Sequence, residues 1–181
     1  MLIQMFRRNL EALLEWFVII LMITLTIVVI VAVLFRIAGD SLSWYDEIAA
    51  IQLSWITYYG AALAALKRRH IGFDSVLLAI PMPKRMIFVV LAEILVLGFF
   101  VILAYTGWQV LDVLEGDMLV SLTWMPVQVT QSVIPIGAVL FIICQLLSFP
   151  DYWRATSSGH SLEHGEIEQE VEQERKKAGA D

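Results

Sequence analysis

The segment His160–His164 reads HSLEH, which has the H-x-x-E-H form of an inverted zinc-protease motif. A working zinc site needs a third ligand and an enclosed coordination sphere. The motif lies instead within an acidic segment, residues 154–181, that contains few apolar side chains. We therefore predict a solvated cytoplasmic tail at 154–181 and no metal site there.

Glu93 is the sharpest polar signal inside an apolar run. A charge at the centre of a bilayer costs about 2.5–3.5 kcal/mol on insertion scales, so an intramembrane acid is a functional candidate. Glu93 follows Arg85 by eight residues, or about 12 Å of helix. Two interpretations stay open: a carboxyl paired at a helix or subunit interface, or an ion or proton relay of a self-sufficient small secondary transporter.

Histidine and cysteine supply no cofactor site within the apolar runs. A haem-carrying membrane anchor needs axial ligands inside the membrane, whereas His70, His160 and His164 all lie outside these runs. Cys144 is the only cysteine, so an internal disulfide is excluded and packing is its expected role. We predict no cofactor, and a membrane anchor of a redox complex remains only as an alternative.

Four long apolar runs must position these residues. The chain has 181 residues, 59% hydrophobic and 17% charged, whereas globular domains carry about 25% charged residues. About 20 apolar residues cross 30 Å of hydrocarbon as a helix, in which every backbone group is paired. The predicted membrane domain, 1–153, contains spans at about 16–36, 48–66, 86–111 and 121–149. We expect an all-α integral membrane protein whose four transmembrane helices form a four-helix bundle.

Two further helices are expected at the membrane surface. Residues 1–15 alternate apolar and charged positions at helical spacing, which is typical of an interfacial helix. Between the second and third spans, Asp74 can cap a short helix at 75–80 that Pro81 ends. This second helix has too few apolar residues to span, so it is predicted to lie along the cytoplasmic surface.

The basic residues predict the orientation. Two precede the first span, five separate the second from the third and four follow the fourth, which leaves only Arg36 on the opposite side. Both termini are therefore expected in the cytoplasm of a bacterial inner membrane. The net charge of −6 comes mostly from the tail and outer connections, which argues against nucleic-acid binding.

The stretch LSWYDEI, Leu42–Ile48, places two aromatic and two acidic residues at the outer end of the second span. Ser43 and Asp46 have the spacing of a helix capping box, and Trp44 suits the membrane interface. Capping explains one carboxylate but not the second, Glu47. We therefore predict that Trp44 and Glu47 contact a partner protein.

The second span also carries small residues at helical spacing. Gly60 and Ala64 form one small-x-x-x-small pair and Ala61 and Ala65 another, which lets a second helix approach closely. Trp55 and Tyr59 follow the same spacing and border the strip. Packing within this chain and contact with another subunit both remain open.

The region from Phe35 to Asp74 resembles the small membrane subunit, DctQ-like, of tripartite ATP-independent periplasmic (TRAP) transporters. The matching pieces are FR at Phe35–Arg36, LSWYDE at Leu42–Glu47, Trp55 and GAALAALKRRHIGFD at Gly60–Asp74. The third and fourth spans match only by layout. Ile37 stands where the family often has a tyrosine.

The resemblance implies a non-catalytic scaffold subunit that assembles with a large multi-span permease subunit in the lipid membrane. A periplasmic substrate-binding protein would deliver an organic acid, and a sodium gradient would drive its import. The residues that match the family pattern are Arg36, Ser43, Trp44, Glu47, Trp55, Gly60, His70 and Asp74. Together with Tyr59 and Ala64 they are the expected subunit interface.

Overall fold

The computed structural model describes residues 2–68, 80–81 and 84–158. Its helices are α1 (Leu2–Ile37), α2 (Tyr45–Lys67), α4 (Lys84–Val113), α5 (Val127–Gln131) and α6 (Val133–Ser158). Four helical stretches are long and apolar enough to cross a membrane, and α5 and α6 together form the fourth. The described ranges contain no strand, so the predicted all-α membrane fold is confirmed.

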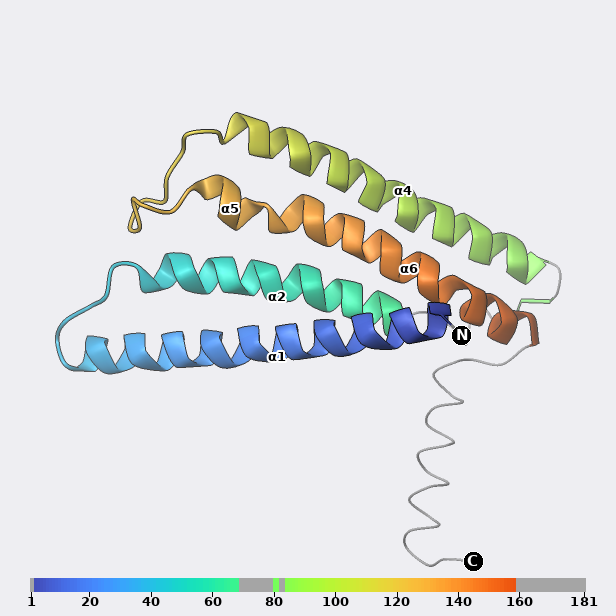
Figure 1. The fold of residues 1–181 in the computed structure, drawn as a ribbon, viewed down its shortest axis with the longest axis horizontal. Helices are drawn as coiled ribbons and strands as arrows, with labels where there is room; N and C mark the ends of the chain where they lie inside the picture. The colour runs from blue at the N-terminus through green and yellow to red at the C-terminus, as the bar shows by residue number, and fades with distance from the viewer. Residues whose placement is uncertain (1, 69–79, 82–83, 159–181) are drawn as a thin grey trace, which may run out of the picture.

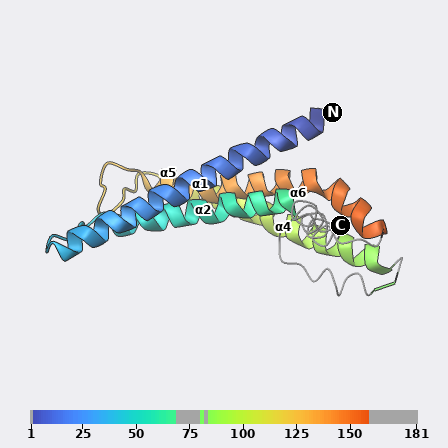
Figure 2. The same ribbon diagram turned by 90° about the horizontal axis from the view of Figure 1, so that it is seen from below.

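The helices form one open layer and not the closed bundle that the four spans suggested. Extensive contacts between the described spans join α1 to α2, α2 to α6 and α6 to α4. Figure 1 shows this order from α1 at the bottom to α4 at the top, and Figure 2 shows the same helices edge-on, with the N-terminal part of α1 rising away from the others. Because lipid tails solvate apolar side chains, no hydrophobic force closes such a layer into a bundle.

Helix α1 is continuous over 36 residues, so the predicted N-terminal interfacial helix is the first part of the spanning helix itself. At 1.5 Å per residue α1 is about 54 Å long, well beyond the 30 Å hydrocarbon core. Its basic first turns therefore extend past the apolar region. The predicted surface helix at 75–80 lies, apart from Ile80, outside the described residues, as do His70, Asp74 and the HSLEH segment.

The fourth span begins at Val127, later than the expected 121, because residues 114–126 form an ordered loop. Met118 and Pro126 pair across this loop as an antiparallel bridge. The Leu119 amide donates to the Met125 carbonyl at 3.1 Å, and the Val127 amide donates to the Asp117 carbonyl at 3.0 Å. At the other end, α6 continues past the expected domain limit at 153 to Ser158.

Close approach of α6 to both neighbours depends on two glycines. A Cβ atom added at Gly137 would lie 2.7 Å from the Cβ of Tyr58 on α2. One added at Gly107 of α4 would lie 3.0 Å from the Cγ2 of Ile134 on α6. Both distances are shorter than ordinary van der Waals contact, so larger residues at these crossings would push the helices apart. Helix α6 therefore packs closely against α2 at Gly137 and against α4 at Gly107.

Candidate functional site

Glu93 lies at the centre of a buried polar cluster formed by Arg68, Glu93, Gln145 and Ser148. The Arg68 Nη2 donates to Glu93 Oε1 at 2.7 Å and Nη1 donates to Oε2 at 3.3 Å. The Gln145 Nε2 also donates to Glu93 Oε2, at 2.9 Å. Only 11% and 12% of the Arg68 and Glu93 side chains are exposed. Both oxygens of the intramembrane carboxylate are thus already bound.

The Arg68 guanidinium also binds α6 directly. Its Nε donates to Ser148 Oγ at 2.8 Å, and Nη2 donates to the Gln145 carbonyl at 3.1 Å. The guanidinium carbon lies 4.6 Å from the centre of the Tyr152 ring, within the range of a cation–π contact. One arginine therefore joins the end of α2 to both α4 and α6.

The backbone at Arg68 explains how the side chain reaches this position. Arg68 caps the C-terminus of α2 in the left-handed conformation, with φ 53° and ψ 32°, and its amide donates to the carbonyls of Ala64 and Ala65. This conformation costs a non-glycine residue about 1–2 kcal/mol. Ser148 Oγ also donates to the Ala65 carbonyl at 3.0 Å, so the helix end and the polar cluster support each other.

Glu47 binds the loop formed by residues 114–126. Its Oε1 accepts from the Val120 amide at 3.0 Å and its Oε2 accepts from the Ser121 amide at 2.9 Å. The Ser121 hydroxyl in turn donates to the Ser43 carbonyl at 3.0 Å. The second carboxylate of the LSWYDE stretch therefore binds a loop within this chain, while the predicted contact of Glu47 with a partner protein stays a prediction.

The predicted capping box is wrong. Trp44, and not Ser43, is the N-cap of α2, and its side chain makes no capping hydrogen bond. Asp46 lies in the first turn as expected, where its charge favours the helix dipole. Ser43 contributes its backbone carbonyl to the loop contact.

Trp55 and Tyr59 contact neighbouring helices of the layer. The Trp55 Nε1 donates to the Thr130 carbonyl of α5 at 3.1 Å. The Tyr59 ring lies 4.7 Å from the Phe17 ring of α1 in an edge-to-face arrangement. These two expected interface residues therefore link α2 to both of its neighbours inside the chain.

The two small-residue pairs of α2 differ in their surroundings. Ala65 is fully buried and Ala61 packs against the same apolar core. A Cβ added at Gly60, in contrast, would meet no atom within 4 Å. Leu53, Thr57, Gly60 and Ala64 follow one another at helical spacing, and we call this surface the open face of α2. Arg36 is exposed in the last turn of α1.

Ion pairs that no local sequence pattern predicts also join the basic ends of the helices. Lys67 pairs with Glu15 and, at 3.2 Å, with Glu11 of α1. Arg7 pairs with Asp151 of α6 and donates to the Leu66 carbonyl at 3.1 Å. The sequence feature that could have indicated these pairs is the presence of Glu11, Glu15 and Asp151 in otherwise basic or apolar segments. Across the described ranges, no three acidic, histidine or cysteine side chains gather as a metal site.

Replacing Glu47 by glutamine is expected to loosen the loop at residues 114–126. Glutamine keeps one carbonyl acceptor but loses the second acceptor and the charge, so one of the two loop amides loses its partner. A charge-assisted hydrogen bond contributes about 1.5–3 kcal/mol when buried and less at this exposed end, so amide exchange at Val120 and Ser121 should accelerate about fivefold. Hydrogen exchange with Asp46→Asn as the control tests this, and equal acceleration in both variants would contradict it.

Comparison with known proteins places this geometry in a family. The family model of the DctQ component of tripartite ATP-independent periplasmic transporters matches residues 25–155, from within α1 into the last turns of α6. A search of curated proteins gives no significant match. The matched region contains the polar cluster, the Glu47 contacts and the open face of α2. The chain therefore belongs to the DctQ family, the small membrane subunits of tripartite ATP-independent periplasmic transporters.

Proposed function

We propose that this chain is a non-catalytic scaffold that holds the large multi-span permease subunit of a TRAP transporter. In this proposal the large subunit imports an organic acid with a sodium gradient, and a periplasmic substrate-binding protein delivers the solute. Membership of the DctQ family supports the assignment to a small permease subunit. We propose an organic acid as the solute and sodium as the coupling ion because the resemblance to the DctQ family implies both.

The observation that carries the scaffold role is the open layer. The extensive contacts between spans join α1 to α2, α2 to α6 and α6 to α4, and they leave broad apolar surfaces exposed along α1 and α4. The open face of α2 has room for a close helix contact at Gly60. A layer of this kind can cover part of a larger membrane protein, whereas a closed bundle presents much less surface per residue.

The polar cluster supports a structural role for Glu93. A relay needs a carboxyl that gains and loses a proton or ion during the cycle. Here Arg68 and Gln145 occupy both carboxylate oxygens, and the same arginine fixes three helices relative to one another. A rigid layer suits a scaffold that must hold its partner in one orientation.

The experiment for the scaffold role is purification in mild detergent followed by reconstitution. The large subunit should co-purify with this chain, and uptake of an organic acid into proteoliposomes should require both subunits, the binding protein and a sodium gradient. Uptake by this chain alone would overturn the proposal in favour of a self-sufficient transporter.

We also propose that both termini are cytoplasmic, since the basic residues concentrate at one end of the layer. Reporter fusions after Arg69 and after Ser158 should report the cytoplasm. Fusions after Asp40 and after Asp117 should report the periplasm. The opposite result at any of the four positions would exclude this orientation.

A further inference from the structure

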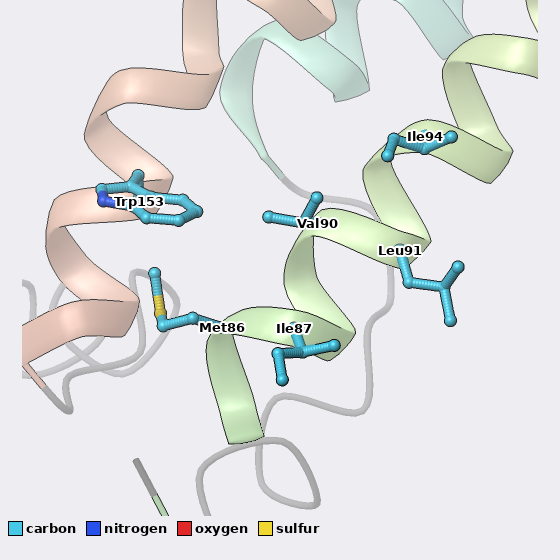
Figure 3. A pocket seen from close by; sticks show the side chains of 6 residues that line it. All are labelled: Met86, Ile87, Val90, Leu91, Ile94 and Trp153. Carbon is cyan, nitrogen blue, oxygen red and sulfur yellow. The ribbon is translucent and has the colours of Figure 1, made fainter. Parts of the chain in front are cut away.

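An apolar groove lies between α4 and α6 at the basic end of the layer. Its lining consists of Met86, Ile87, Val90, Leu91 and Ile94 of α4 and Trp153 of α6. Its volume is about 540 Å³. Figure 3 shows the Trp153 ring, Val90 and Met86 on facing sides of the space between the helices, with Ile94 further along α4. From Met86 to Ile94 the groove extends about 12 Å, close to the roughly 15 Å of hydrocarbon in one leaflet.

Positive charge flanks the end of the groove near Met86. Lys84 is the first residue of α4, is exposed, and forms no ion pair with any residue that the structure describes. It lies three residues before Ile87 and so shares a helix face with a lining residue. The first turn of α4 contains no acidic residue, and its backbone dipole adds further positive potential. The Arg154 side chain, next to Trp153, is 81% exposed and lies 4.0 Å from a carboxylate oxygen of Asp151, so Lys84 is the main cation at this end of the groove.

Trp153 adds a hydrogen-bond donor to the groove. Its ring packs against Phe149 with centroids 5.7 Å apart and is 37% exposed. Within the described ranges the indole N–H has no hydrogen-bond acceptor. An indole at the membrane interface places its ring in the apolar region and its N–H toward polar groups. The apolar groove, the Lys84 cation and the Trp153 N–H donor therefore lie at the same end of α4.

We propose that this groove binds one anionic phospholipid. The lipid belongs to the cytoplasmic leaflet, which rests on the orientation proposed above. An acyl chain lies along Val90, Leu91 and Ile94, while Lys84 and the Trp153 indole contact the phosphate region. Basic residues near this leaflet attract anionic headgroups, whereas a zwitterionic headgroup carries its own positive charge. All six lining side chains are apolar, as contact with an acyl chain requires, and the exposed Lys84 beside them favours an anionic headgroup.

The acyl slot is tested by a matched pair of substitutions in the full chain, purified with the large subunit wherever the two co-purify. Ile94→Trp fills the groove, while Ile102→Trp adds the same bulk to α4 outside it; these isoleucines are 61% and 64% exposed. Native mass spectrometry in detergent with added phosphatidylglycerol should show one retained lipid in the wild type and in Ile102→Trp. The Ile94→Trp variant should lose it, with at least tenfold weaker binding.

The headgroup contact is tested by charge. Lys84→Gln should weaken phosphatidylglycerol binding about fivefold, the usual effect of one basic residue near an anionic headgroup. Arg8→Gln removes an exposed basic residue of α1 and should leave binding unchanged. Equal binding of phosphatidylglycerol and phosphatidylethanolamine, or equal behaviour of Lys84→Gln and Arg8→Gln, would overturn the proposal. Loss of the lipid from the complex with the large subunit would also overturn it, by showing that protein fills the groove. These measurements require no transport, so their failure is distinct from failure of the proposed function.

Discussion

The Glu93→Leu variant should unfold with a free energy about 3–5 kcal/mol lower than that of the wild type. Removing one member of a buried ion pair leaves the other charge uncompensated in a low-dielectric site. The Arg68 guanidinium would retain Ser148 Oγ and the Gln145 carbonyl but lose the one carboxylate that it binds among the described residues. Unfolding of the purified subunit in mixed detergent micelles, followed by circular dichroism, measures this difference.

The double variant Arg68→Met with Glu93→Leu provides the decisive comparison. Buried ion pairs replaced entirely by apolar residues are often as stable as the originals, so the double variant should recover most of the lost stability. The partly exposed pair of Lys67 with Glu15 is the control, and breaking it should cost about 1 kcal/mol or less. Additive losses in the double variant would show that Arg68 and Glu93 are not coupled.

The same double variant separates a structural role of Glu93 from a proton or ion relay. It contains no titratable group at position 93, yet it should keep the three helices together through apolar packing. An assembled transporter carrying it should therefore retain solute uptake. Loss of uptake in a complex that still assembles with normal stability would restore the relay interpretation.

The four spans could be predicted from the sequence because the bilayer imposes a length and a composition on each of them. Their arrangement could not, since contacts between helices in lipid depend on local shape. Gly107 and Gly137 decide where α6 meets its neighbours, but their sequence gives no sign of which helix each one faces. The sequence shows two pairs of small residues in α2, but it does not show that Ala61 and Ala65 pack inside the chain while Gly60 has no neighbour within 4 Å of an added Cβ.

Of the polar cluster, the sequence predicts Glu93 as a candidate but not its partner Arg68. Glu93 was conspicuous because an acid inside a span is costly. Its partner Arg68 lies 25 residues earlier and looked like an ordinary cytoplasmic charge, because its role depends on the left-handed end of α2. Glu47 likewise binds a loop 73 and 74 residues away, which no local pattern reveals.

Replacing Gly60 by phenylalanine should separate assembly from folding. A Cβ added there meets no atom within 4 Å, and phenylalanine favours a helix more than glycine does, so the isolated subunit should keep its thermal stability. If the large subunit packs a helix on the open face of α2, the added ring removes that close approach. Interface contacts of this kind are worth 2 kcal/mol or more, so the affinity for the large subunit should fall about thirtyfold.

Gly98→Phe is the matched control for this prediction. Gly98 also lies inside a spanning helix, α4, and a Cβ added there likewise meets nothing within 4 Å, so both variants add the same ring to an open surface. Pull-down titration of the large subunit should show the loss for Gly60→Phe alone. Unchanged binding in both variants, or a loss confined to Gly98→Phe, would remove the open face of α2 from the interface. In the second case the partner would instead pack against α4, which forms the edge of the layer opposite α1.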